Sequence, residues 1–206
     1  MSRDGLDRPS RDVRLHPMSP AISDAEHLDA LLPRLRSLES DAFTALYDAM
    51  ARQLLTFANG LLGDRESAED IVQDTFVRFA RHARRFRGDG RALLAWLYTT
   101  ARRRCIDHRR RHSTHREVAF ARLPDVEASP PVPLQVDPDL EIAMATLTDP
   151  QRTAIVLRRI LGYSGEEVGA LMGLDREAVY ALCARGERAL RTRLTSDAAA
   201  PDRPER

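Results

Sequence analysis

Apolar residues recur at steps of three and four along much of the chain, which is the spacing of one face of an α-helix. One such stripe contains Ile71, Val72, Thr75, Phe76, Phe79, Ala80, Ala83 and Phe86. Another contains Phe43, Leu46, Tyr47, Met50, Leu54, Phe57 and Leu61. The aromatic content of 5% favours light helical cores over β-sandwiches. The pattern therefore predicts an all-α protein.

Capping residues mark the helices of an N-terminal domain, which is expected over residues 23–116. Ser23 opens a capping-box pattern, and Pro33 should bend or interrupt the helix that follows. Asp64 is the expected N-cap of the helix that carries the first stripe, in which acidic residues precede arginines. The expected helices span residues 23–38, 40–63, 64–85 and 92–111.

A second helical domain is expected over residues 139–194. Prolines between residues 117 and 138 interrupt the helical pattern and predict a linker. Residues 1–22 and 195–206 show no helical period and are expected to be disordered. The second domain should hold a helix near its start, a helix from a cap at residue 148 to residue 161, and a helix-turn-helix unit.

The helix-turn-helix unit is predicted from four residues. Ser164 opens a capping box, and Asp175 is the expected cap of the second helix, which should run to about residue 193. Gly169 is the small residue that lets the second helix approach, and Gly173 supplies a turn conformation that other residues resist. This unit is typical of DNA-binding domains.

The basic charge of the chain is carried by arginine alone. All 32 basic residues are arginines. Residues 65–122 contain fifteen of these arginines and only seven acidic residues. Arginine suits phosphate and base-edge contacts, so the first domain should supply most of the attraction to DNA. Genome composition is an equally good explanation of the arginine bias. Residues 139–194 carry eight basic and eight acidic residues.

The cysteine content points to a reducing compartment, and the absence of long apolar runs argues against a membrane span. Cys105 and Cys183 are far apart in sequence and give no disulfide framework. No apolar run approaches the length of a membrane span, and the N-terminus lacks a signal-peptide core. A cytoplasmic protein without membrane association is expected.

Several segments of the first domain resemble a known family. The segment AEDIVQDTFVR at residues 68–78 is followed by FRG, by WLYTTAR and by Asp107 with Arg110 and Arg111. This order resembles region two of bacterial sigma factors of the extracytoplasmic-function type, and the likeness spans residues 43–111. The C-terminal unit is similar to region four of the same family. The resemblance implies an N-terminal helical bundle joined by a proline-rich linker to a helix-turn-helix domain.

The resemblance also implies partners and contacts. A sigma factor binds core RNA polymerase, directs it to promoters and helps to melt the duplex, and a cognate anti-sigma factor would fit the family. The helix expected over residues 64–85, whose first half is acidic, would dock on the polymerase clamp helices. Complementation of the helix dipole alone is the rival explanation of that acidic half. The implied polymerase contacts are Glu69, Asp70, Gln73, Asp74 and Val77.

Downstream promoter DNA, both double-stranded and melted, would bind the next helix and the loop before it. A core position is the rival reading of Trp96, and a solvated face is the rival reading of the arginine run. Arg103 stands where the family usually has asparagine, which leaves the captured base open. The implied contacts are Arg84, Arg85, Arg87, Trp96, Tyr98, Arg102, Arg103, Arg109, Arg110 and Arg111.

Upstream promoter DNA would bind the second helix of the helix-turn-helix unit. The family commonly has threonine, basic residues and serine at its start, and here these positions are Ala178, Tyr180, Ala181, Leu182 and Glu187. A narrow base readout is therefore expected, with Arg176 as its main base reader. The implied contacts are Arg176, Tyr180, Arg185 and Arg188.

Two other function classes are compatible with parts of the sequence. The helix-turn-helix unit alone is compatible with a free-standing regulator that binds operator DNA without polymerase. A metal-binding protein is suggested by Cys105, His108, His112 and His115, which share one helix face. Ten residues of helix span about 15 Å, too far for one zinc site, so no metal is expected. The chain shows no nucleophile with an adjacent base and no phosphate loop, so no enzyme and no cofactor is expected.

Overall fold

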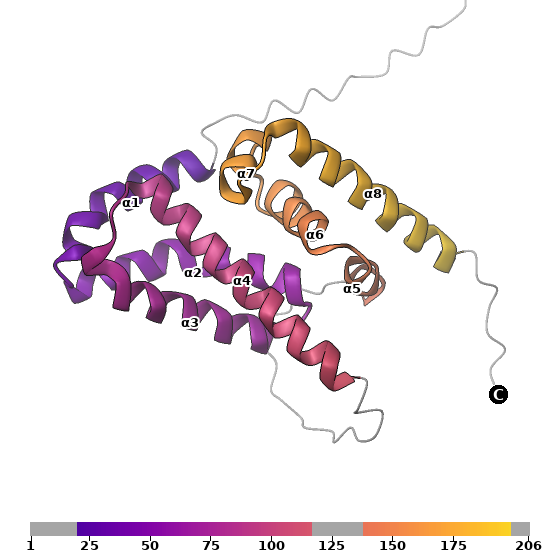
Figure 1. Cartoon of the computed structure of the whole chain (residues 1–206), viewed down its shortest axis with the longest axis horizontal. Coiled ribbons are helices and arrows are strands. Elements are labelled where there is room, and N and C mark those ends of the chain that lie inside the picture. The colour runs from indigo at the N-terminus through magenta and orange to yellow at the C-terminus, as the bar shows by residue number, and fades with distance from the viewer. Residues whose placement is uncertain (1–19, 117–137, 199–206) are drawn as a thin grey trace, which may run out of the picture.

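The structure is a computed structural model that describes residues 20–116 and 138–198, and every regular element in these ranges is helical. The predicted all-α fold class is confirmed (Figure 1). The predictions of disorder and of a linker fall mostly on residues outside the described ranges. The elements are α1 (Pro20–Arg36), α2 (Ser40–Leu62), α3 (Arg65–His82), a 3₁₀ turn (Ala83–Arg85), α4 (Gly90–Arg116), α5 (Pro138–Ala145), α6 (Asp149–Ile155), a π-helical turn (Val156–Ile160), α7 (Gly165–Met172) and α8 (Arg176–Ala198).

The first four helices bury most of the two predicted stripes in a common core. Thr75 is buried as predicted, and its hydroxyl donates to the carbonyl of Ile71 at 2.7 Å, which satisfies this polar group. Two predicted core positions are wrong. Tyr47 is 51% exposed and Ala80 is exposed, because both lie at the solvent edge of their stripes.

Helix α1 differs from its prediction at its first residue, and it is not interrupted at the proline. It begins at Pro20 rather than at Ser23, and it continues through Pro33 without interruption. Pro33 is exposed, while Leu28 and Leu32 on the inner face are buried. A proline inside a helix costs about 3 kcal/mol, and burial of the apolar face of α1 offsets this cost.

The helix-turn-helix prediction is confirmed in its geometry. Ser164 Oγ accepts from the Glu167 N–H at 3.2 Å, and Glu167 Oε2 accepts from the Ser164 N–H at 2.7 Å. A Cβ built on Gly169 would lie 2.6 Å from the carbonyl oxygen of Leu174, and Gly173 has a φ of +69°. Both glycines are therefore required where α7 meets α8. Helix α8 runs past its predicted end near residue 193 and ends at Ala198.

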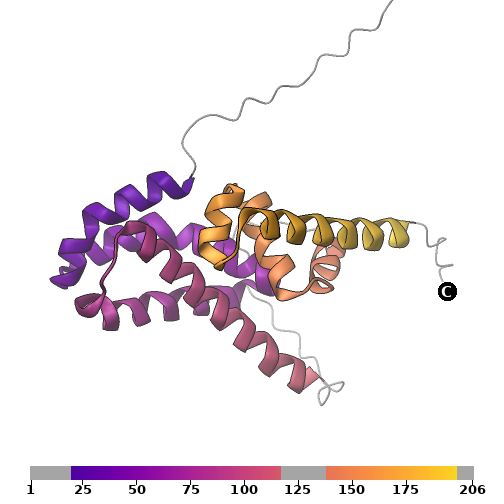
Figure 2. The same cartoon turned by 45° about the horizontal axis from the view of Figure 1, so that its top comes forward.

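The two helical units lie against each other. Helix α6 and the π-helical turn pack beside α2, and α7 packs beside α4 (Figure 2). Val156 is buried where Gly60 leaves space, since a Cβ built on Gly60 would lie 2.9 Å from Val156 Cγ2. This packing brings residues of the second helical unit onto the surface of the first.

Candidate polymerase and nucleic-acid interfaces

Four of the five residues predicted to contact polymerase lie on the exposed side of α3. Asp70 and Gln73 are exposed, and Val77 is 41% exposed. Glu69 is exposed as well, and its carboxylate accepts a hydrogen bond from Arg65 Nε at 2.8 Å. Steps of three and four residues place these side chains next to one another. We name Glu69, Asp70, Gln73 and Val77 the α3 face.

Asp74, the fifth predicted contact, joins α3 to α4. Its Oδ2 accepts from Arg78 Nε at 2.8 Å and pairs with Arg104 Nε of α4 at 2.7 Å. Burial opposes ionisation of this carboxyl, but the hydrogen bond from Arg78 and the charge of Arg104 outweigh it and lower the pKa of Asp74. Arg104 is a structural partner of Asp74 that the sequence patterns missed, because the two residues are distant in sequence.

Replacing Asp74 by asparagine will lower the free energy of unfolding at pH 7. The folded pKa of Asp74 lies below its unfolded value of about 3.9, so its ion pairs stabilise the protein above that pH. This stabilisation is lost as the pH falls through the folded pKa. Urea unfolding between pH 7 and pH 3 will show the difference between wild type and variant shrink towards acid.

The control for this comparison is Asp48→Asn, which removes an exposed carboxylate from α2. Its unfolding free energy should stay close to that of the wild type across the range. A loss in Asp74→Asn that does not change with pH would contradict the ion-pair role.

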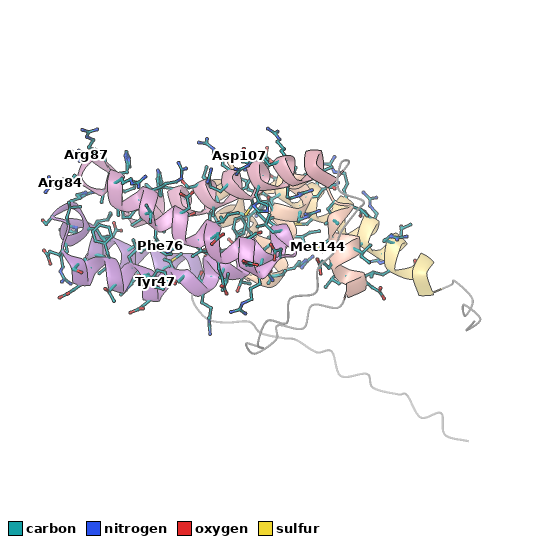
Figure 3. The ribbon with its side chains drawn as sticks, turned by 90° about the horizontal axis from the view of Figure 1, so that it is seen from below. Tyr47, Phe76, Arg84, Arg87, Asp107 and Met144 are labelled. Carbon is teal, nitrogen blue, oxygen red and sulfur yellow. The ribbon has the colours of Figure 1, made fainter. Side chains whose placement is uncertain are left out.

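An apolar flank adjoins the α3 face. The rings of Tyr47 on α2 and Phe76 on α3 lie 5.0 Å apart, next to each other on the surface seen in Figure 3. Phe76 is half-buried and directly precedes Val77. An exposed tyrosine at the edge of a core stripe is typical of an interaction surface, since its ring is apolar and its hydroxyl is polar. The stripe pattern alone placed Tyr47 in the core.

The loop from Phe86 to Gly90 is fixed by α1. Arg36 donates from Nη2 to the carbonyl of Gly88 at 2.7 Å and from Nε to that of Phe86 at 3.3 Å. Asp29 Oδ1 accepts from the Gly90 N–H at 2.6 Å. A Cβ built on Gly90 would lie 1.9 Å from a carbonyl oxygen of α1, so only glycine fits at the start of α4.

Three predicted DNA contacts surround this loop. Arg84, Arg85 and Arg87 are exposed, and Arg84 and Arg87 lie together at one end of the bundle (Figure 3). Arg87 Nη1 donates to the carbonyl of Arg84 at 3.1 Å, so the side chain folds back along the loop. The arrangement places three guanidinium groups beside a rigid backbone.

The two aromatic residues predicted to contact downstream DNA have different surroundings. Trp96 is half-buried, stacks parallel to His82 with ring centroids 6.1 Å apart, and meets Phe79 edge-on. Tyr98 is 2% exposed, and its hydroxyl lies 2.8 Å from that of Tyr163. In this arrangement of the two units the Tyr98 ring is enclosed, so it is not on the surface where DNA was predicted to bind, and its DNA contact stays a prediction. His82 joins Trp96 as a stacking residue that the sequence patterns missed.

Arginines along α4 form a second basic surface. Arg109 pairs with Asp149 of α6 and is half-buried. Of the other predicted contacts, Arg102 is half-buried, whereas Arg103, Arg110 and Arg111 are exposed. An open hollow of about 340 Å³ is lined by Arg104, Asp107, Arg110 and Arg111. Arg104 is already paired with Asp74, but Arg110 and Arg111 outweigh Asp107 and leave this hollow with a net positive charge, which suits a phosphate.

The predicted upstream contacts lie on α8. Arg176 is exposed and has weak ion pairs with Glu166 at 3.5 Å and Glu177 at 3.4 Å. The Tyr180 ring lies 5.0 Å from the guanidinium carbon of Arg158. Both side chains remain on the surface near the start of α8. The exposed arginines farther along the helix are Arg185 and Arg188.

The candidate zinc ligands fall only partly on residues whose side chains the structure describes. Cys105 is buried, and burial raises the pKa of its thiol to about 12, so the thiolate that zinc binds is disfavoured. The side chains of His112 and His115 lie outside the described residues. Among the side chains that are described, no three His, Cys, Asp or Glu residues could hold a metal ion. None of the helices in the described ranges is long and apolar enough to cross a membrane.

Comparisons with known proteins cover both helical units. Residues 46–115 match Sigma-70 region 2, and residues 139–190 match Sigma-70, region 4. The chain is 31% identical to the ECF RNA polymerase sigma factor BldN of Streptomyces coelicolor over 189 residues, which covers 89% of this chain and 72% of BldN. It is 30% identical to the RNA polymerase sigma factor CarQ of Myxococcus xanthus, with 78% of this chain and 93% of CarQ covered.

The fold has relatives among solved structures as well. CnrH, solved in complex with the cytosolic domain of CnrY, superposes with a TM-score of 0.60 at 25% identity, covering 82% of this chain and 98% of CnrH. The α3 face, the α4 arginines and the helix-turn-helix unit thus lie within regions two and four. The chain belongs to the ECF RNA polymerase sigma factors.

Proposed function

We propose that this sigma factor binds core RNA polymerase through the α3 face and promoter DNA through α4, the loop before it, and α8. The observation that carries the proposal is the segregation of exposed side chains. The α3 face carries acidic, polar and apolar side chains, whereas arginines predominate among the exposed side chains of the loop and of the second half of α4. One surface suits a protein partner and the other suits phosphate, so the chain can hold enzyme and DNA at once.

The loop and the Trp96–His82 stack form the proposed site for melted downstream DNA. A flat aromatic pair offers a stacking surface for an unpaired base, and the nearby arginines neutralise its phosphates. The fixed backbone of the loop presents both groups in one orientation. Arg103, Arg110 and Arg111 are proposed to track the adjoining duplex, because they lie farther along α4 and are exposed.

The upstream element is proposed to bind α8 with few base contacts. Arg176 is the base reader, while Arg185 and Arg188 hold phosphates. Replacing Arg176 by alanine should relax preference at one upstream base pair, at a cost of about 1–3 kcal/mol for the preferred base. Transcription from promoters randomised at the upstream element will measure this. Preference lost at several positions, or at none, would count against Arg176.

We also propose that the protein acts in the cytoplasm with the polymerase and is held inactive by an anti-sigma protein. The support comes from the partners found with similar proteins in solved complexes. CnrH was solved with the cytosolic domain of CnrY, and the sigma factor RpoE of Bartonella quintana was solved with the anti-sigma factor NepR. The catalytic chemistry of transcription belongs to the polymerase. A sigma factor contributes recognition and melting.

Transcription in vitro tests the proposed function directly. Purified protein, core RNA polymerase and a library of genomic promoter fragments are combined, and the transcripts are sequenced. Start sites that require both the protein and the core enzyme are expected, and they would reveal the promoter consensus. Sequence-specific DNA binding without any core-dependent transcript would favour a free-standing regulator.

Alanine at both Arg110 and Arg111 should weaken promoter binding by the polymerase complex equally for all sequences. Each lost phosphate contact lowers the slope of log affinity against log salt by about 0.9, so the slope should fall by roughly two. Titrations at several salt concentrations measure the slope, and Arg52→Ala, an exposed arginine of α2, is the control. An unchanged slope would remove both residues from the DNA interface.

A further inference from the structure

Tyr180 is an exposed aromatic residue near the start of α8, and its ring is held by other residues of the second helical unit. The residue is 48% exposed, although a tyrosine ring is largely apolar. The guanidinium carbon of Arg158, on the π-helical turn, lies over the ring at 5.0 Å from its centroid, which is within the reach of a cation–π interaction. The ring is therefore supported by a cation and is still accessible to a partner.

Gly165, the first residue of α7, leaves room for this ring. A Cβ built on Gly165 would lie 3.1 Å from Tyr180 Cε2 and 3.1 Å from Tyr180 Cζ, closer than ordinary van der Waals contact. The same Cβ would lie 3.1 Å from Arg176 Cγ, so the stem of Arg176 passes the same point. A buried glycine thus seats Tyr180 and Arg176 next to each other, one turn apart on α8.

Arg158 is itself fixed, so it can support the ring in one position. It is half-buried, and its Nη1 donates to the carbonyl of Tyr163 at 3.0 Å. Its Nε is buried and has no hydrogen-bond partner among the described residues. Because one nitrogen is bonded to the backbone and another is enclosed, the guanidinium group cannot leave Tyr180 without losing the hydrogen bond to Tyr163.

The next residue of the π-helical turn holds α8 at a second point. Arg159 Nε donates to Glu187 Oε1 at 2.7 Å. Tyr180 and Glu187 are about two helical turns apart, so they lie on the same side of α8. Two consecutive arginines of a π-helical turn, a conformation that is frequent at functional sites, thus fix this side of the helix.

We propose that Tyr180, positioned by Arg158, is a specificity-determining residue that contacts the methyl group of a thymine in the upstream promoter element. The inference rests on the proposed binding of upstream DNA by α8. Thymine presents its C5-methyl group in the major groove, and apolar side-chain atoms are the usual contact of that group. A ring that is held in place loses little further freedom on binding, so it discriminates between bases better than a mobile one.

The position of Arg176 defines where this thymine lies. Residues four apart on a helix have Cβ atoms about 5–6 Å apart, and successive base pairs are about 3.4 Å apart. The thymine is therefore expected within about two base pairs of the position that Arg176 reads. The two residues together give the upstream element one hydrogen-bonded contact and one apolar contact.

Promoters in which uracil replaces thymine test the contact, because uracil pairs as thymine does but lacks the methyl group. In a promoter transcribed by this protein with core polymerase, each thymine of the upstream element is replaced in turn, and transcript yield is measured at limiting promoter. With the wild type, one replacement within about two base pairs of the Arg176 position should lower the yield about fourfold, the factor for one buried methyl-sized group.

Two variants of Tyr180 separate the ring from its hydroxyl. Tyr180→Phe keeps the ring and should show the same loss on uracil, whereas Tyr180→Ala should transcribe equally from the thymine and uracil promoters. The readout is a ratio of yields on two promoters, so a general loss of stability or activity does not change it. A wild type that is insensitive to every uracil, a Tyr180→Phe protein that loses the preference, or a Tyr180→Ala protein that keeps it would overturn the inference.

Arg158→Met tests the positioning role with the same ratio. Methionine removes the cation and keeps a long apolar side chain, so the thymine preference should fall towards one, while Arg158→Lys should retain part of it. In the Tyr180→Ala background the same change should leave the ratio at one. A preference unchanged in Arg158→Met would overturn the positioning role of Arg158. Absence of any core-dependent transcript from the wild type would instead refute the proposed function.

Discussion

Replacing Asp70 and Gln73 together by alanine will weaken binding to core RNA polymerase about 30-fold. Truncations at the centre of a protein interface often cost about 2 kcal/mol, which corresponds to this factor. Both side chains are exposed on α3 and lie off the buried stripe, so the fold should be unaffected. Affinity for core enzyme, measured by titration of labelled protein, gives the loss, and circular dichroism checks that the helices remain.

The Asp70→Ala/Gln73→Ala variant removes proposed polymerase contacts and leaves the packing between helices unchanged. Asp74 is left unchanged, because its ion pair with Arg104 holds α4 and its removal would alter two interfaces at once. Glu26→Ala removes an exposed carboxylate from α1 and serves as the control. Wild-type affinity in a folded Asp70→Ala/Gln73→Ala protein would show that the α3 face is not where polymerase binds.

Phe79→Ala should unfold the first domain at moderate denaturant concentration. Phe79 is fully buried on α3, and its ring packs against Phe43, Phe86 and Trp96 at centroid distances of 6.3, 5.8 and 5.5 Å. Truncating a buried phenylalanine costs about 3–5 kcal/mol through lost burial and the cavity left behind. Small domains are stable by about 5–15 kcal/mol, so this loss is a large share.

Urea unfolding followed by helical circular dichroism measures this loss. Phe76→Ala, one turn earlier on the same helix, is the matched control, because its half-buried ring leaves a smaller cavity. Equal losses in the two variants would show that the cluster around Phe79 is not the anchor of the loop and of Trp96.

Local signals in the sequence predicted the parts of the fold that local physics decides. Asp64 caps α3 by accepting from the Ser67 N–H, Asp175 caps α8 by accepting from the Ala178 N–H, and Gly173 adopts a positive φ. Each of these features depends on neighbours within a few residues, so the residue type is enough to predict it. The same holds for the α3 stripe, whose period alone identifies its buried side.

Features that depend on distant partners could not be predicted in this way. Periodicity assigned Tyr47 to the core, but the neighbouring helices leave it at the edge. The contact of Tyr98 with Tyr163 and the ion pair of Asp74 with Arg104 were not predicted by any pattern, although both residues had been singled out as contacts of other molecules. In each case two segments far apart in sequence meet, and no local pattern encodes that meeting.

The hydrogen bonds by which Arg36 and Asp29 of α1 hold the loop from Phe86 to Gly90 have a consequence for sequence variation in this protein. The match to Sigma-70 region 2 begins at residue 46, after α1 has ended at Arg36. A fragment cut at that boundary would keep every residue proposed to touch polymerase or downstream DNA, yet it would lose Arg36 and Asp29, which fix the loop backbone. Promoter preference can therefore change through substitutions in α1, a helix that is not proposed to contact a base. Exchanging α1 between related proteins should transfer that preference.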